Sequence, residues 1–384
     1  MSNDRIYLDH NATTPVDPRV LDAMLPYFTE IYGNASSVDH EYGYEAKQAV
    51  DQAREQVAEL INARPEEIIW TSGATEAINL ALFGVAEKYA DKGDHIITCQ
   101  TEHKAVLDTC RRLEQLGKQI TYLPVDRYGR IAPDDVRRAI TPKTILISIM
   151  AANNEIGTIA PLAEIGAIAK EQGILFHSDA AQAFGHISLD VRTINVNLMS
   201  ISAHKIYGPK GVGALYSQRG NPFVRLTPLI YGGGHERGVR SGTLNTPGIV
   251  GLGAAAKLCR LQSEETDRFR QMTSFMYEQL REKLGNVELN GHPTDRLPNN
   301  LNLYIKGVES KSLIVQLKDV AISTGSACTS LHVEPSHVLK ALGHSDERIH
   351  QSVRLGVGRF TTQQQVEAAS ERMIQAVHVL RTLT

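Results

Sequence analysis

ILFHSDAAQAFGHISLDVRTINVNLMSISAHK, residues 174–205, contains two short apolar runs that each lead into a titratable residue. Ile174–Ser178 is followed directly by Asp179, and Leu198–Ser202 is followed after two intervening residues by Lys205. Apolar runs of this length predict strands that are buried on both faces. Ligand sites of α/β proteins form at the carboxyl ends of such strands, so the stretch predicts both a fold class and a candidate site.

Similar runs occur on both sides of this stretch and alternate with helix-patterned segments. They are Glu67–Thr71, His95–Cys99, Thr144–Met150 and Gly213–Ser217. The alternation predicts an α/β fold with a mostly parallel sheet flanked by helices. After Gly251 the pattern changes to a long charged helical stretch followed by the strand candidates Asn302–Ile305, Val320–Ser323 and Val353–Val357. We therefore predict a large domain of residues 15–251 and a smaller α+β domain of residues 1–14 and 252–384.

Composition argues against several classes of protein. The 384 residues carry a net charge of −3, so no global positive field favours nucleic acid or an anionic membrane. No apolar run approaches the ~20 residues of a membrane span, and the first residues lack the apolar core of a signal peptide. The four cysteines, Cys99, Cys110, Cys259 and Cys328, form neither a CxxC pair nor a zinc-type cluster. We expect no metal site and a reduced, cytoplasmic compartment.

The segment SISAHKIYGPKGVG, residues 200–213, is the strongest chemical signal. A lysine between an apolar strand and a Gly/Pro-rich turn is partly desolvated, which lowers its pKa and makes Lys205 a usable Schiff-base amine. Ser202 and His204 add donors suited to a phosphate. Asp179 fits the carboxylate that keeps the ring nitrogen of pyridoxal phosphate (PLP) protonated. A solvated surface lysine and a helix-capping aspartate are the alternatives for the two residues taken singly.

Weaker signals lie at other strand ends. TSGATE, residues 71–76, joins a strand to a helix and predicts a phosphate cradle at the helix N-terminus, although no Walker motif follows. His103 in TEHKA can stack on a planar cofactor or shuttle protons, or be structural. Arg354 lies inside an apolar strand, where a guanidinium needs a carboxylate partner, and the carboxylate of an amino-acid substrate would supply one.

Two loops of small residues complete the candidates. Cys328 lies in ISTGSACTS, residues 322–330, where small neighbours predict an accessible thiol that can attack sulfur. The other three cysteines lie in apolar-periodic segments and are predicted to be core or near-core. GGGHERGVRSGT, residues 232–243, does not fit the GxGxxG nucleotide motif, and Arg237, Arg240 and Thr243 suit a phosphate or a subunit contact instead.

Taken together, these segments resemble the group I cysteine desulfurases, a PLP-dependent family of fold type I within the class V aminotransferase superfamily. The resemblance extends over nearly the whole chain and is carried by YLDHNATTPVDP, TSGATEA, TEHKAVLDTC, NNEIGT, HSDAAQA, SAHKIYGPKGVGALY, GGGHERGVRSGT and GSACTS. It implies a large domain with a mostly parallel seven-stranded sheet flanked by helices, a smaller α+β domain that carries the catalytic cysteine loop, and a homodimer.

The resemblance also implies an activity, in which L-cysteine becomes L-alanine and its sulfur passes to Cys328 as a persulfide. The catalytic residues would be Lys205, which bonds to PLP, together with Cys328 and His103. The cofactor-binding residues would be Thr75, His103, Asn154, Asp179, Gln182, Ser202, His204, Lys205 and, from the other subunit, Thr243. Within this set Asp179 would pair with the ring nitrogen, Gln182 with the ring hydroxyl, and Thr75, Ser202, His204 and Thr243 with the phosphate. Arg354 would bind the substrate carboxylate, with Asn154 beside the substrate amine.

The destination of the sulfur stays open between an iron–sulfur scaffold, another sulfur carrier and DNA phosphorothioate modification. The loop through Leu331–Pro335 is long, as in group I members. Housekeeping bacterial members carry a further scaffold-docking segment after the point where this chain ends in RTLT, and Ala35 replaces a common proline. A selenocysteine lyase or aminotransferase is the nearest rival enzyme. A non-catalytic partner of a sulfur-transfer complex would be expected to have lost Lys205, Asp179, His103 or Cys328, and all four are present.

Overall fold

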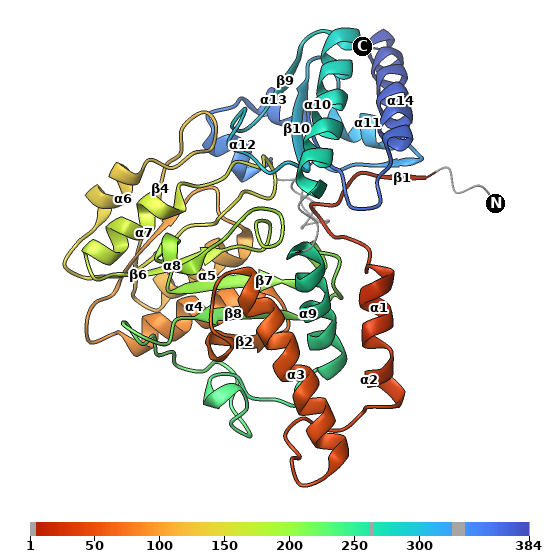
Figure 1. Ribbon diagram of the computed structural model, residues 1–384. Helices are drawn as coiled ribbons and strands as arrows, with labels where there is room; N and C mark the ends of the chain where they lie inside the picture. The colour runs from red at the N-terminus through yellow and green to blue at the C-terminus, as the bar shows by residue number, and fades with distance from the viewer. Residues whose placement is uncertain (1–4, 261–263, 325–334, 384) are drawn as a thin grey trace.

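The computed structural model describes residues 5–260, 264–324 and 335–383 (Figure 1). Cys328 and the rest of the predicted cysteine loop therefore lie outside the described residues. Among the described helices, none combines the length and apolar character that crossing a membrane would need.

The centre of the molecule is a seven-stranded sheet with the order β2-β8-β7-β6-β5-β3-β4. These strands are β2 (Ile68–Thr71), β3 (His95–Cys99), β4 (Gln119–Leu123), β5 (Thr144–Ser148), β6 (Leu175–Asp179), β7 (Leu198–Ser202) and β8 (Gly213–Ser217). Only β8 runs against its two neighbours, and all other pairings are parallel. The predicted α/β fold with a mostly parallel sheet is confirmed. Edge strand β4 had no apolar run to reveal it, because most of its residues are partly exposed.

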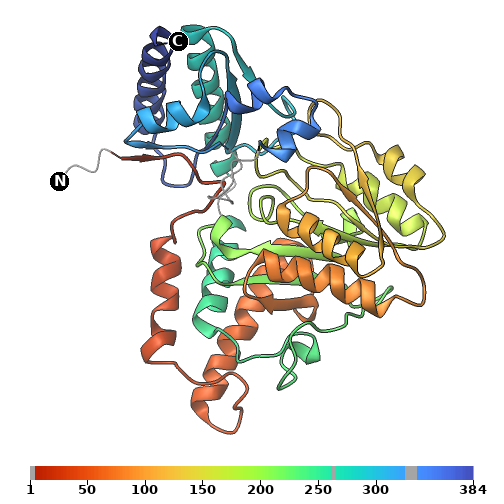
Figure 2. The same ribbon diagram turned by 180° about the vertical axis from the view of Figure 1, so that it is seen from behind.

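Helices cover both faces of this sheet (Figures 1 and 2). One hydrophobic cluster joins the sheet to α3 (Glu41–Leu60), α7 (Leu162–Glu171) and α9 (Thr246–Arg260), and a second joins it to α4 (Ala74–Lys88) and α5 (Lys104–Gln115). Trp70 belongs to the first cluster and its neighbour Ile69 to the second. Successive side chains of a strand point to opposite faces, so burial of both explains the continuous apolar runs. Shorter helices are α1 (Pro18–Met24), α2 (Pro26–Thr29), α6 (Pro133–Ala139) and α8 (Val191–Ile194).

A smaller unit stands beside the strand ends (Figure 2). Its antiparallel sheet has the order β12-β10-β9, formed by β9 (Val287–Leu289), β10 (Asn300–Ile305) and β12 (Ser352–Gly356), and β1 (Ile6–Tyr7) pairs in parallel with β11 (Val320–Ala321). Its helices are α10 (Glu264–Leu284), α11 (Ser310–Gln316), α12 (His337–Ala341), α13 (Asp346–His350) and α14 (Gln363–Thr382). Ile6 and Leu8 share a hydrophobic cluster with these later elements, so both ends of the chain enter one core. The proposed division at residues 14/15 and 251/252 stays a prediction.

The three described cysteines are free thiols in or near the core. Burial raises the pKa of Cys99 and Cys110 to about 12 and that of Cys259 to about 11. A thiol attacks sulfur as thiolate, so these three are poor nucleophiles at neutral pH. Within the described residues, no group of three or more His, Cys, Asp and Glu side chains could hold a metal ion.

Candidate active site

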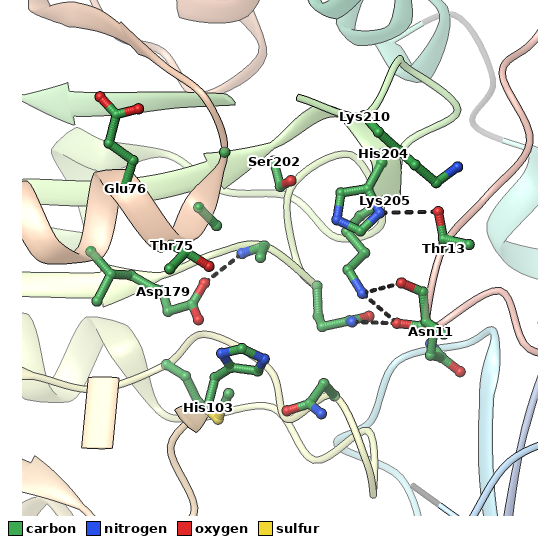
Figure 3. A pocket seen from close by; sticks show the side chains of 18 of the residues that line it. Asn11, Thr13, Thr75, Glu76, His103, Asp179, Ser202, His204, Lys205 and Lys210 are labelled. Carbon is green, nitrogen blue, oxygen red and sulfur yellow. Dashed lines mark hydrogen bonds between the residues drawn. The ribbon is translucent and has the colours of Figure 1, made fainter. Parts of the chain in front are cut away.

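A cavity of about 530 Å³ opens where the parallel strands end (Figure 3). Nine predicted site residues line it: Thr75, His103, Asn154, Asp179, Gln182, Ser202, His204, Lys205 and Arg354. Thr243 is exposed and does not line the cavity. The structure thus gathers residues that are up to 279 positions apart, from Thr75 to Arg354, around one space.

Asp179 is the last residue of β6, and its carboxylate is buried at the cavity wall. One carboxylate oxygen accepts from the backbone N–H of Ala181 at 2.9 Å (Figure 3). Burial raises the pKa of Asp179, and the nearby charges of His103 and Lys205 oppose that shift. A buried carboxylate of this kind is stabilised by a cationic partner, which a protonated ring nitrogen would supply.

Lys205 follows β7 at the end of a short 3₁₀ turn, Ala203–Lys205. Its ammonium donates to the carbonyl oxygens of Asn11 at 2.6 Å and Ala12 at 2.8 Å, and the Gln182 amide donates to the same Asn11 oxygen at 2.8 Å (Figure 3). The 11–12 backbone therefore holds the amine at the cavity. Sequence reasoning assigned no role to this segment, although its letters belong to the motif YLDHNATTPVDP.

A cradle for an anion lies at the N-terminus of α4, between the TSG turn and Ser202. Gly213 lets the turn at Gly73 pack closely against the strands, because a Cβ at position 213 would lie 2.4 Å from the Ile201 carbonyl oxygen and 2.7 Å from the Gly73 Cα. Free N–H groups of a helix N-terminus favour a phosphate. Lys210 also lines this cavity and was missed by sequence reasoning, which stopped at Lys205.

Two histidines of the cavity are held by defined hydrogen bonds. His103 caps α5, and its Nδ1 accepts from the Ala105 N–H at 3.1 Å, which leaves the proton of the neutral ring on Nε2. Nδ1 of His204 contacts the Thr13 hydroxyl at 3.1 Å (Figure 3). Burial, with the charges of Lys205 and Lys210, lowers the pKa of His204 to about 4, so its ring is neutral at pH 7.

Arg354 on β12 reaches the cavity from the smaller unit. One terminal nitrogen donates to the Asn154 carbonyl at 2.9 Å, and the other pairs with Asp9 at 2.8 Å. Its Nε is buried and has no hydrogen-bond partner among the described residues. These two contacts use two of the five N–H groups of the guanidinium, so the protein orients it and donors remain for a ligand. Asp9, which orients it, was missed by sequence reasoning because its partner lies 345 residues away.

These groups match the functional groups of PLP. An amine can bond to its aldehyde, a buried carboxylate can pair with its ring nitrogen, and a helix N-terminus can bind its phosphate. The residues present therefore fit this cofactor.

This fold and site define the class of protein. The chain belongs to the class V aminotransferase family, whose family model matches residues 6–369. The resemblance to cysteine desulfurases drawn from the sequence is confirmed by individual relatives. The chain is 53% identical to cysteine desulfurase IscS of Anaeromyxobacter dehalogenans strain 2CP-C over 380 residues, 99% of this chain and 94% of the relative.

Solved structures agree with that relationship. A NifS-like protein superposes with a TM-score of 0.91 at 36% identity, covering 98% of this chain and all of the other. SspA in complex with cysteine superposes with a TM-score of 0.82 at 37% identity, covering 93% of this chain and 100% of that one.

Proposed function

We propose that the protein is a PLP-dependent cysteine desulfurase, which converts L-cysteine to L-alanine and transfers the sulfur to Cys328 as a persulfide. The observation that carries this proposal is one cavity that holds the Lys205 amine, the buried Asp179 carboxylate and the Arg354 guanidinium, whose Nε has no hydrogen-bond partner among the described residues. A solved relative that binds cysteine supports the choice of substrate.

PLP, when bound, supplies an electron sink for the pair released when the Cα proton of the substrate leaves. Asp179 would keep the ring nitrogen of the bound cofactor protonated, and the burial of its carboxylate would strengthen that interaction. Lys205 would hold the cofactor through its amine, and the same amine, once free, would move the Cα proton of the substrate. The carbonyl oxygens of Asn11 and Ala12 hold the ammonium at the cavity, because carbonyls accept from its protonated form.

Arg354 orients the substrate, because N–H groups of its guanidinium that the protein does not use donate to the α-carboxylate, while Asp9 and the Asn154 carbonyl hold the guanidinium in place. The Cys328 thiolate attacks the substrate sulfur, so that a sulfur–sulfur bond forms and the carbon–sulfur bond breaks. The carbon fragment takes up protons and leaves as alanine, and a reductant later releases the persulfide sulfur. His103 exchanges protons with the substrate or the thiol through Nε2, since its Nδ1 is committed to the α5 backbone.

We propose iron–sulfur cluster assembly as the destination of the sulfur, supported by 53% and 51% identity to IscS proteins of Anaeromyxobacter dehalogenans and Rickettsia africae. A homodimer, in which exposed Thr243 reaches the partner's cofactor, is part of the same proposal, as is a cytoplasmic location.

The proposal is tested by incubating PLP-loaded protein with L-cysteine and a reductant and measuring sulfide and alanine together. Equal amounts of both products are expected from the native protein and neither from Cys328→Ala. Cys259→Ala is the matched control and should keep activity, because that thiol is near the core and its pKa is raised to about 11. Alanine formed by Cys328→Ala at the native rate would contradict the persulfide route. No alanine from the native protein would contradict the desulfurase function.

A further inference from the structure

A second cavity, of about 680 Å³, lies where the parallel strands of the large sheet begin, opposite to the strand ends near Lys205. It is lined by the amino-terminal ends of β5 and β6 at Thr144 and Leu175, by the end of α7 and by the loop after β8. It shares no lining residue with the candidate active site. Its volume falls within the ~300–1,000 Å³ of typical small-molecule clefts.

The lining of this second cavity is strongly basic. It contains Lys92, Lys170, Arg192 and Arg225 and no aspartate or glutamate among the described residues. Arg192 pairs with the buried Glu67, whereas Lys170 donates to the neutral amide oxygen of Asn195 at 2.9 Å. Within the part of the chain that the structure describes, no ion pair joins Lys92, Lys170 or Arg225 to a carboxylate. In a chain whose net charge is −3, this concentration of unneutralised cations favours an anionic ligand.

A buried hydroxyl in the same cavity also lacks a partner. Tyr216 lines the cavity, its side chain is 0% exposed, and its hydroxyl has no hydrogen-bond partner in the described structure. A buried polar group without a partner is destabilising and rare in folded proteins. Burial raises the pKa of Tyr216, so at neutral pH its hydroxyl is protonated and available as a donor to an anion.

The other walls of the second cavity contain aromatic rings that suit a flat organic group, and contacts within the protein already hold their side chains in place. Lys92 lies 5.3 Å from the ring centroid of Tyr89, and the guanidinium of Arg225 lies 5.7 Å from that of Phe223, so both aromatic rings sit beside cations. The Asn197 side chain donates to Gln218 at 2.7 Å, which fixes two polar residues of the wall before any ligand binds. Preorganised walls lower the entropic cost of binding.

We propose that this cavity is a binding site for a phosphate-bearing small molecule with a flat ring, of nucleotide size. Lys170 and Arg225 bind the phosphate, Tyr216 donates to one of its oxygens, and Tyr89 and Phe223 contact the ring. The proposal does not depend on the desulfurase function, because the two cavities have no residue in common.

The test is isothermal titration of the PLP-saturated protein with ADP and, separately, with pyrophosphate. Saturating the protein with its cofactor keeps either probe from occupying the phosphate cradle near Ser202. Saturable binding of ADP is expected, and weaker binding of pyrophosphate would show that the ring contributes. Lys170→Gln and Arg225→Gln should each weaken ADP binding about tenfold, the loss expected for one hydrogen bond to a charged group. Lys283→Gln, an exposed lysine on α10, is the matched control and should bind ADP normally.

Tyr216→Phe removes only the hydroxyl for which the described residues offer no partner. ADP affinity should fall while the melting temperature stays the same or rises, because the variant no longer buries an unpaired polar group. No saturable binding of either probe would overturn the proposal. Binding that is unchanged in both Lys170→Gln and Arg225→Gln would also overturn it, because the probe would then occupy another place.

Discussion

Arg354→Lys is the substitution that most directly tests how the site binds substrate. In the native structure the Asn154 carbonyl and Asp9 each accept from one terminal nitrogen of the arginine, and among the described residues the other N–H groups of the guanidinium, Nε included, are left for a ligand. A lysine keeps the positive charge but cannot hold both protein partners and donate to a carboxylate in the same geometry. The loss of one hydrogen bond to a charged group is about 1.5–3 kcal/mol, which corresponds to a decrease in kcat/KM of roughly 10- to 150-fold.

The assay is the initial rate of alanine formation over a range of L-cysteine concentrations. The carboxylate is bound alike before and during the reaction, so we expect the loss mainly as a higher KM. Arg348→Lys, in α13 of the same unit and ion-paired with Glu288, is the control and should leave KM unchanged. Denaturant unfolding curves of both variants would show whether Arg354→Lys is folded as stably as the control. A folded Arg354→Lys protein with native kcat/KM would refute the assignment of this arginine to the substrate.

Three other substitutions test separate features. Arg54→Met would leave the buried Glu236 without the guanidinium that donates to it at 2.8 and 2.9 Å, and should lower the free energy of unfolding by about 3–5 kcal/mol in denaturant titrations; an unchanged midpoint would contradict this. Lys205→Ala should lose alanine formation and the absorption of covalently bound cofactor, and a variant that keeps both would show that another amine is used. Burial lowers the pKa of His177 to about 3. The His177 imidazole therefore binds a proton near pH 6.5 in the unfolded chain but only near pH 3 in the native state. The free energy of unfolding should fall as pH drops through that window, by up to ~1.4 kcal/mol per pH unit for this residue. The free energy of unfolding of His177→Asn, measured in denaturant titrations, should fall less between pH 7 and pH 4.5 than that of the native protein. An equal fall in both proteins would contradict the lowered pKa of His177.

Much of the fold could be predicted because it depends on local patterns. Continuous apolar runs such as 144–150 and 174–178 predicted strands buried on both faces, and the sheet has them there. Strand β4 was missed because its exposed edge position removes the apolar run that marks a buried strand. The predicted core or near-core placement of Cys99, Cys110 and Cys259 is also confirmed by the structure.

The candidate site was predictable to the extent that its residues follow strands. Asp179 ends β6 and Lys205 lies three residues after the end of β7, and parallel strands end at one side of a sheet, so their shared cavity follows from sequence order. Asp9, Asn11 and Lys210 were missed. Asn11 meets Lys205 through its backbone carbonyl, which any residue type carries, and so no sequence pattern could single it out.

The sequence by itself determined the class of fold, the order along the chain of the strands and of the reactive residues near their ends, and the family to which the chain belongs. It could do so because periodicity and motifs are properties of neighbouring residues. Tertiary structure alone decided which donors of Arg354 remain for substrate, because Asp9 and Asn154 come from distant parts of the chain. It also decided that the buried Tyr216 hydroxyl, which has no hydrogen-bond partner among the described residues, lines one cavity together with four cationic side chains. Such features depend on which distant segments pack together, and that is settled only when the whole core forms.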